Sequence, residues 1–315
     1  MRVIDQAEVR RRLTFEMCIP LVRQAMIALS RGETRQLLRT IIPLGEGRAF
    51  GIMPGALGER AVFGAKLVSV YPENFAQGRQ SHQGLVVLFD GETGRPICVA
   101  HAGEITAIRT AAASAVATDA LARPEASQLA LLGYGEQAYT HACALSKVRR
   151  LEALSVWGRS PERAQAFARR ITEDLGLPCE ARPTAQAAVA QADMVCTVTN
   201  AAEPILKGAW LAPGTHVNLV GSSYAGPSEA DVDLVAAARF IADSREGVLA
   251  QGAEFLNAKA AGLVDNDHVV GEIGQVLAGD LPGRQSPDQI TVYKSLGHVV
   301  QDLAAAEALY RSQGA

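Results

Sequence analysis

Apolar and polar positions repeat with two different periods along the first hundred residues of this chain. Apolar side chains recur every three or four positions over 15–31, which predicts a helix that ends at Gly32, and Asp5 can cap a shorter helix over 5–12. Strand-like stretches follow at 38–44, 50–54, 61–71, 85–90 and 97–100, and turn residues at 91–96 predict a hairpin between the last two. Consecutive strands of this kind indicate an antiparallel or mixed sheet.

The pattern changes at Gly103, after which helices alternate with short apolar strands. A long alanine-rich helix is expected over 104–122. Strands at 128–133, 152–157, 194–199 and 215–220 then alternate with helices at 136–147, 161–175 and 184–192, with a short piece near 179–181. This order predicts a doubly wound parallel sheet. A last helix, 296–312, lies beyond the alternating region and is expected to return to the first domain.

A glycine-rich turn follows the first strand of this alternating region. Gly133 permits a tight turn, Gly135 lets the backbone approach a pyrophosphate, and Ala138 allows close helix–strand packing. The next strand ends at Gly158, where an NAD site would place an acid for the ribose hydroxyls, and Arg159 follows with a cation suited to a 2′-phosphate. We predict an NADP(H) site; the alternative is a βαβ unit without a nucleotide.

Composition narrows the remaining possibilities. A chain of 315 residues favours two domains, and a net charge of −3 does not indicate a nucleic-acid surface. The five cysteines are far apart, without metal-binding spacing, so we expect free thiols in a reducing cytoplasm and neither disulfides nor a metal site. The charged N-terminus does not resemble a secretory signal, and no apolar run reaches membrane length.

Short segments along nearly the whole chain resemble the ornithine cyclodeaminase/mu-crystallin family. The matching segments are Leu38-Arg39-Thr40-Ile-Ile-Pro43, Gly51-Ile-Met-Pro54-Gly55, Ala65-Lys66-Leu-Val68, Ser81-His82-Gln83, Ile105-Thr-Ala-Ile-Arg109-Thr110-Ala-Ala112, Leu132-Gly-Tyr-Gly-Glu-Gln-Ala138, Thr197-Val-Thr199, Glu203-Pro204-Ile-Leu206, Val217-Asn218-Leu-Val-Gly221 and Lys294-Ser295-Leu-Gly297. The resemblance implies an α/β protein with a central Rossmann-type domain, 123–295, that binds NADP(H). It also implies an α+β substrate-binding and dimerisation domain, 1–122 with 296–315, and a homodimer formed through the sheets of these domains.

Two departures from the cyclodeaminases point to one branch of the family. Ser223 stands where cyclodeaminases carry an Asp that acts on the substrate's amino group, and a hydroxyl is a poor base at neutral pH. Gly158 stands where they carry an Asp suited to NAD. The run 221–229 resembles the Δ1-pyrroline-2-carboxylate reductases, which implies NADPH-dependent reduction of a cyclic ketimine carboxylate. The products would be L-proline and, from the six-membered homologue Δ1-piperideine-2-carboxylate, L-pipecolate.

This chemistry suggests a role for each candidate side chain. Arg39 and Arg109 would clamp the substrate carboxylate, because a guanidinium matches its two oxygens. Lys66 lies in an apolar strand and would serve the imine nitrogen as donor and proton source. His82 would orient Lys66 or relay a proton, and Ser223 would bond the ring nitrogen or a water. For each side chain the alternative is a structural or solvent-facing residue. We expect the clamp and the nicotinamide to meet at a cleft between the domains.

A further group of residues would bind the cofactor. The candidates are Gly133, Gly135, Glu136, Gln137, Ala138, Arg159, Ser160, Arg163, Thr110, Val198, Thr199 and Leu296. NADP(H) is preferred and NAD(H) is possible. Three other functions stay open: an alanine-type amino acid dehydrogenase, an ornithine cyclodeaminase, and a non-catalytic NADP(H)-dependent binder of small molecules.

Overall fold

The chain forms two compact units, each with its own sheet. The computed structural model describes residues 1–77 and 82–312, apart from the side chains of 75–77 and 82. One unit is Met1–Arg109 together with the segment from His298, and the other is Thr110–Gly297. The boundary between the two units falls inside helix α3 (Ala102–Leu121), whereas the domains expected from the sequence meet between residues 122 and 123. Arg109 bonds Gln301 of the first unit, whereas Thr118, further along the same helix, bonds Asn218 of the second.

The first unit is built on a seven-stranded mixed sheet. Its order is β1-β7-β6-β5-β4-β2, with β3 also paired to β4; the β1–β7 pair is parallel, and the other pairs of described strands are antiparallel. The strands are β1 (Arg2–Ile4), β2 (Arg35–Gln36), β3 (Thr40–Gly45), β4 (Arg48–Ala56), β5 (Phe63–Val70), β6 (His82–Phe89) and β7 (Pro96–His101). The predicted hairpin is β6–β7, and the mixed sheet is confirmed. The sequence did not predict β1.

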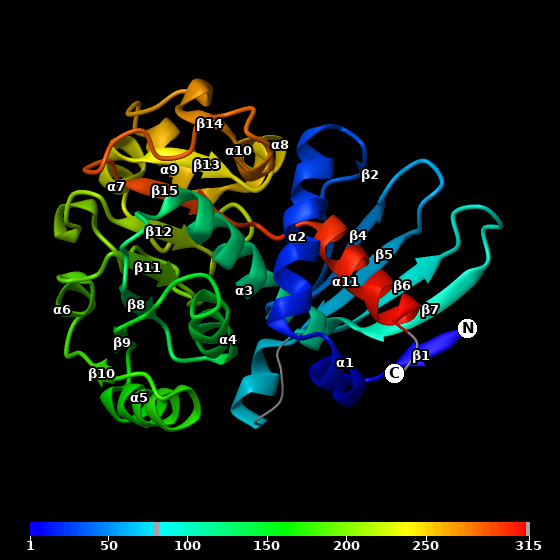
Figure 1. Ribbon diagram of the computed structural model, residues 1–315, viewed down its shortest axis with the longest axis horizontal. Coiled ribbons are helices and arrows are strands. Elements are labelled where there is room, and N and C mark those ends of the chain that lie inside the picture. The colour runs from blue at the N-terminus through cyan, green and yellow to red at the C-terminus, as the bar shows by residue number, and fades with distance from the viewer. Residues whose placement is uncertain (78–81, 313–315) are drawn as a thin grey trace. The chain divides into compact units, whose positions relative to one another are not determined.

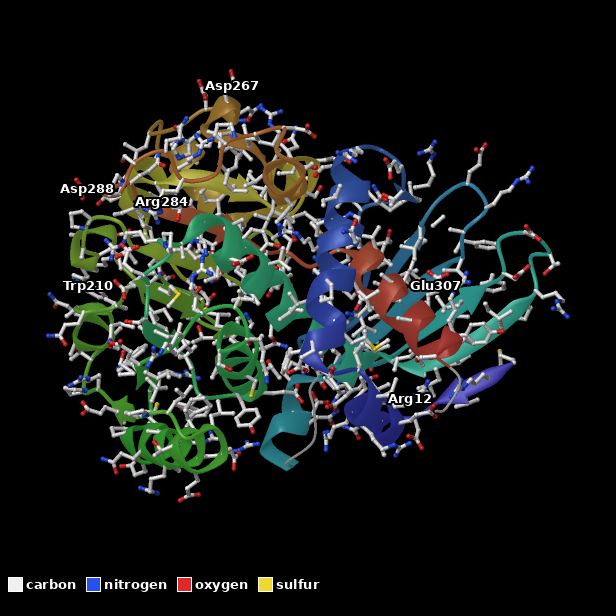
Figure 2. All side chains as sticks on the ribbon, in the orientation of Figure 1. Arg12, Trp210, Asp267, Arg284, Asp288 and Glu307 are labelled. Atoms are coloured by element: carbon white, nitrogen blue, oxygen red, sulfur yellow. The ribbon has the colours of Figure 1, made fainter. Side chains whose placement is uncertain are left out.

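Among its described residues this unit has the helices α1 (Gln6–Arg12), α2 (Phe15–Ser30) and α11 (Val299–Arg311), and a 3₁₀ turn, η1 (Pro72–Gln77), follows β5. Asp5 accepts the Glu8 amide at 2.8 Å and so begins α1. In Figure 1, α11 lies across one face of the sheet, and α2 packs against α11. Arg12, labelled in Figure 2, donates to the Leu309 carbonyl at 2.9 Å and thereby ties the two ends of the chain.

The two faces of this sheet have different surroundings. Lys66 and its cross-strand neighbour Val86 lie on the buried face. Phe63 and Leu85 lie on the opposite face and are 38% and 45% exposed. Phe63 stacks on its partner Phe89 with ring centroids 5.3 Å apart. The sheet therefore has apolar side chains on both faces, although only one face is covered within the unit.

The second unit contains an eight-stranded sheet in which every pair is parallel. Its order is β10-β9-β8-β11-β12-β15-β13-β14. The strands are β8 (Gln128–Leu132), β9 (Ala153–Trp157), β10 (Cys179–Ala181), β11 (Met194–Thr197), β12 (His216–Leu219), β13 (Arg239–Ala242), β14 (Val269–Glu272) and β15 (Thr291–Lys294). The α/β class and the doubly wound sheet predicted from the sequence are confirmed.

Helices and 3₁₀ turns connect these strands. They are α4 (Glu136–Leu145), α5 (Pro161–Leu175), α6 (Ala185–Val189), α7 (Val232–Ala237), α8 (Arg245–Gln251), α9 (Ala253–Ala260), α10 (Ile273–Ala278), η2 (Gly208–Trp210) and η3 (Asn266–His268). The sequence did not predict the elements between 221 and 294. Arg284, labelled in Figure 2, fixes the segment before β15 by donating to the Leu121 carbonyl at 2.9 Å and to Thr291 at 3.0 Å.

All five cysteines are free thiols, and Cys18, Cys98 and Cys196 are buried. No single helix among the described residues is long and apolar enough to cross a membrane. The bent pair α1–α2, with a 90° angle between its helices, meets the criterion of length and composition only when taken together.

Candidate functional site

Lys66, Arg109 and Asp302 meet in the interior of the first unit, each from a different element. The Asp302 carboxylate on α11 accepts from Lys66 Nζ of β5 at 3.1 Å, and the same oxygen accepts from Arg109 Nε of α3 at 3.1 Å. Their side chains are 5%, 4% and 0% exposed for Lys66, Arg109 and Asp302. Two cations share one anion, so the fully ionised cluster has a net positive charge.

Burial and neighbouring charges set the protonation of this cluster. Burial lowers the pKa of Lys66 to about 8, with Asp302 opposing the shift and the charges of Arg109 and Arg39 adding to it. Burial alone would raise the pKa of Asp302, but the cations of Arg109 and Lys66 hold that pKa below its ordinary value. Lys66 is therefore an ammonium at neutral pH that can release its proton nearby, as a general acid requires.

Two polar side chains complete the cluster. Thr106 Oγ1 lies 2.6 Å from Lys66 Nζ. Gln301 accepts from Arg109 Nη1 at 2.9 Å and donates to Met26 Sδ at 3.2 Å. The third proton of Lys66 and the Nη2 of Arg109 have no acceptor among the described residues. The cluster therefore retains donors for a bound anion or a C=N nitrogen.

Asp302 and Gln301 are site residues that the sequence did not reveal as candidates. Asp302 shares one face of α11 with Val299, Ala306 and Leu309, all of them buried. A carboxylate on an apolar helix face was the available signal, because a buried charge requires a partner. Its oxygen Oδ2 is buried and has no hydrogen-bond partner among the described residues.

Arg39 and His82 are the other two predicted site residues in the first unit. Arg39 is half-buried between β2 and β3, and its charge lowers the pKa of both Lys66 and His298. His298, at the start of α11, has a pKa of about 4 because of burial, so it is neutral at pH 7. Arg39 thus acts on the cluster through its charge. The predicted role of His82 falls on a side chain outside the described residues.

The glycine-rich turn of the second unit has the features that a pyrophosphate needs. Gly133 has a φ of +125°, and a Cβ there would lie 2.9 Å from the Val198 carbonyl oxygen. Gly135 precedes α4 without a capping side chain, and a Cβ added to it would meet no atom within 4 Å. The first amides of α4 therefore face open space beside Gly135, and this arrangement fits a phosphate group. Ala138 is fully buried, as close helix–strand packing requires.

The predicted 2′-phosphate residues gather at the end of β9 and the start of α5. Arg159 is exposed and makes no hydrogen bond or ion pair with any residue that the structure describes. Ser160 caps α5 by accepting the Arg163 amide at 3.3 Å, and its hydroxyl donates to Glu162 at 2.8 Å. Ser160 therefore has a structural task, and the acid beside it would oppose an incoming phosphate.

A buried carboxylate holds the loops that follow β11 and β12. Glu229 accepts from the Thr199 amide at 2.6 Å and from the Gly221 amide at 2.7 Å. Burial raises the pKa of Glu229, against the opposing effect of its hydrogen bonds from Thr199 and Thr197. Next to it, Glu254 forms a fully buried ion pair with Lys294 at 2.7 Å.

The loop after β15 is held in the same way. Lys294 Nζ donates to the Ser222 carbonyl at 2.7 Å, and Asp243 accepts the Leu296 and Gly297 amides at 2.7 and 2.8 Å. Ligands of parallel α/β sheets bind outside the carboxyl ends of the strands. These buried ions therefore position the loops at the edge where a cofactor would bind, and the sequence did not identify their role.

The remaining predicted residues belong to the second unit. Thr110 and Leu296 are buried, whereas Val198, Thr199 and Ser223 are half-buried. Glu136 is exposed in the first turn of α4, and the buried Oε1 of Gln137 has no partner among the described residues.

Comparisons with known proteins show which family this chain is similar to. A model of the ornithine cyclodeaminase/mu-crystallin family matches residues 1–314. The chain is 34% identical over 312 residues to a Δ(1)-pyrroline-2-carboxylate reductase of Bacillus cereus (strain ZK / E33L), covering 98% of this chain and 96% of that one. It is 36% identical over 300 residues to the ketimine reductase mu-crystallin of Mus musculus, covering 94% and 92%.

A solved structure has a similar fold over the whole chain. It is that of the Thermococcus litoralis Δ(1)-pyrroline-2-carboxylate reductase, in complex with NADH and L-proline. The TM-score is 0.95 at 32% identity, and the match covers 98% of this chain and 96% of that one.

Proposed function

Because the chain belongs to the ornithine cyclodeaminase/mu-crystallin family, we propose that it is a nicotinamide-dependent oxidoreductase that reduces the C=N bond of a cyclic ketimine carboxylate. The proposed substrate is Δ1-pyrroline-2-carboxylate and the product L-proline, with Δ1-piperideine-2-carboxylate giving L-pipecolate. One methylene changes binding in an apolar pocket by only about 1–3 kcal/mol, so we expect both rings to react. The observation that carries the proposal is the buried cluster of Lys66, Arg109 and Asp302.

The guanidinium groups suit the carboxylate of such a substrate. Arg109 is fixed by Asp302 through Nε and by Gln301 through Nη1, which leaves Nη2 as a donor of set direction. Arg39 adds a second positive charge within electrostatic reach of the cluster. A charge-assisted hydrogen bond contributes about 1.5–3 kcal/mol, so two such contacts account for selective binding of an anionic imine.

Lys66 suits the imine nitrogen. A protonated imine accepts hydride far better than a neutral one, and the nitrogen becomes an amine in the product. The ammonium of Lys66, with a pKa of about 8, can hydrogen-bond that nitrogen or give it the proton. Asp302 and Thr106 hold the other two N–H bonds, so the donor keeps its direction through the reaction.

The second unit would hold the cofactor, which supplies a hydride from C4 of its reduced nicotinamide when bound. The uncapped start of α4 and the open space at Gly135 would hold the pyrophosphate. We propose that NADPH is preferred, because Gly158 brings no carboxylate to the ribose and Arg159 has a guanidinium available for a 2′-phosphate. Arg159→Ala should then raise the KM for NADPH much more than the KM for NADH.

We also propose that the protein is a homodimer in the cytoplasm. The uncovered face of the first unit's sheet presents Phe63, Leu85 and, on β3, Ile42, with exposed fractions of 38–48%. A second copy placed against this face would bury these apolar side chains. The cytoplasmic location rests on the five unpaired thiols.

A spectrophotometric assay with Δ1-pyrroline-2-carboxylate tests the proposed activity. Consumption of reduced nicotinamide should accompany formation of L-proline, identified by chiral chromatography, and should be faster with NADPH than with NADH. Lys66→Met keeps the length of the side chain and removes its charge, so it should abolish most of kcat. Turnover of pyruvate with ammonia at a higher kcat/KM would replace the proposal by an alanine-type dehydrogenase.

The same preparation distinguishes a cyclodeaminase from a non-catalytic binder. Ornithine should not be converted to proline with release of ammonia, because Ser223 offers a hydroxyl in place of the required acid. Ammonia release at a rate near that of imine reduction would contradict this assignment. Tight NADPH binding without turnover of any of these substrates would indicate a protein that binds small molecules without catalysis.

A further inference from the structure

Tyr134 packs against the end of β9, where a ribose-binding acid stands in many dinucleotide sites. It is the middle residue of the Gly133–Gly135 turn. A Cβ placed on Gly158 would lie 2.1 Å from Cε1 and 2.3 Å from Cδ1 of the Tyr134 ring. Atoms do not approach so closely, so any residue other than glycine at position 158 requires the ring to move.

The same ring contacts a cation. The Arg163 guanidinium carbon lies 5.4 Å from the centroid of the Tyr134 ring, within the range of a cation–π interaction. Arg163 is in the first turn of α5, whose cap is Ser160. Tyr134 thus links the glycine-rich turn to the two positions, 158 and 163, that would face an adenosine ribose.

We propose that Tyr134 determines cofactor specificity by excluding a carboxylate from position 158 and holding Arg163 beside Arg159 for a 2′-phosphate. The inference rests on the proposed function, whose cofactor it concerns. A carboxylate at this strand end selects NAD(H) by bonding the ribose hydroxyls, and arginine accommodates the phosphate of NADP(H). Selection would therefore depend on a residue of the pyrophosphate-binding turn as well as on Arg159.

The contact predicts that position 158 cannot be changed on its own. Direct titration of the folded protein with NADPH or NADH, followed by nicotinamide fluorescence without substrate, gives the two dissociation constants. Gly158→Asp should weaken both cofactors and create no preference for NADH. Tyr134→Ala with Gly158→Asp makes room for the carboxylate and should bind NADH at least about tenfold more tightly than Gly158→Asp alone, as a hydrogen bond to a charged group allows.

Single changes at Tyr134 test the ring itself. Tyr134→Phe keeps the ring and should leave the ratio of the two dissociation constants within about twofold, whereas Tyr134→Ala should lower the preference for NADPH about three- to fivefold. Tyr139→Ala is the matched control. The Arg170 guanidinium carbon lies 3.9 Å from the centroid of the Tyr139 ring, elsewhere in the second unit. That variant should not change the ratio.

An NADH preference produced by Gly158→Asp alone would overturn the inference, and so would an unchanged ratio of the two dissociation constants in folded Tyr134→Ala. Equal affinity of the unaltered protein for NADPH and NADH would also refute it, while leaving imine reduction intact. Clear NADPH preference in a protein that does not reduce ketimines would refute the proposed function and keep this assignment.

Discussion

Replacing Asp302 by asparagine tests whether this carboxylate keeps the buried Lys66 charged. The side chains have nearly the same size, so the change removes an anion 3.1 Å from both Lys66 Nζ and Arg109 Nε without creating a cavity. Two unit charges about 4 Å apart interact by about 4 kcal/mol at an effective dielectric constant near 20. A guanidinium does not lose its proton in a protein, so the loss of the anion must appear as a change in the pKa of Lys66.

The magnitude follows from the pKa of Lys66, which is already lowered to about 8. If the amide dipole and solvent recover about half of the lost attraction, roughly 2 kcal/mol remains, which lowers this pKa by a further 1–2 units. The ammonium is the active form, so kcat/KM falls as the pH rises through the pKa of Lys66. Asp302→Asn should therefore move that fall from about pH 8 to about pH 6–7. It should also lower the free energy of unfolding by about 3–5 kcal/mol.

The assay is kcat/KM for imine reduction between pH 5 and 10, with urea unfolding measured beside it. The positive charge of the Lys66→Arg variant does not titrate in this range. Any fall of kcat/KM with rising pH that this variant still shows therefore belongs to the substrate imine. Gln301→Leu removes a partner of Arg109 but leaves the carboxylate, and its profile should match the unaltered protein. A folded Asp302→Asn variant whose kcat/KM still falls at about pH 8 would refute the reasoning.

Three other perturbations test the rest of the structure. Lys294→Met leaves Glu254 buried without its cation and should lower the free energy of unfolding, measured in urea, by about 3–5 kcal/mol. Adding Glu254→Gln should recover much of this loss, and an unchanged free energy of unfolding in Lys294→Met would contradict a buried ion pair. Arg39→Met should raise the KM for the imino acid about tenfold with a smaller change in kcat, and an effect confined to kcat would remove it from the clamp. Leu85→Glu places a charge on the uncovered sheet face and should shift sedimentation from dimer to monomer, whereas an unchanged dimer would exclude this face as the interface.

Elements whose signal is local could be predicted from the sequence. The apolar spacing of 15–31 and the cap at Thr14 define α2, and the strand–glycine–helix order around Gly133 defines the first βα unit. The predicted helix at 296–312 begins later, as α11, because Gly297 has a φ of +80° and His298 is extended. Local sequence specifies these features, since capping and backbone conformation depend on near neighbours.

The second half of the parallel sheet was not predicted for a physical reason. The helices α7, α8 and α10 have six or seven residues, too few for a clear amphipathic period. Strand β15 lies between β12 and β13, so the last strand in the chain occupies an interior position. Its place follows from tertiary pairing over more than seventy residues, such as His216 with Thr291, which no local window contains.

Some residues of the candidate site could likewise be predicted from local sequence, whereas others could be found only from the fold. Lys66 and Arg109 could be chosen because each is a cation in a largely apolar strand or helix. Their partner Asp302 is 236 residues from Lys66, so only the fold brings them together. Gly158 was explained from the sequence by cofactor chemistry alone, whereas the structure adds a steric cause in the ring of Tyr134.

The two groups of buried ions differ in a way that separates binding from support. In the second unit, Asp243 accepts backbone amides of Ser244, Leu296 and Gly297, and Glu229 likewise accepts those of loop residues. Bonds within the fold therefore satisfy most of their oxygens. In the first unit, donors of Lys66 and Arg109 and one oxygen of Asp302 lack partners among the described residues. Unsatisfied buried polar groups are costly, so their retention is expected where a ligand completes them. This contrast favours the first cluster as the place where substrate binds and the second as the support for the cofactor loops.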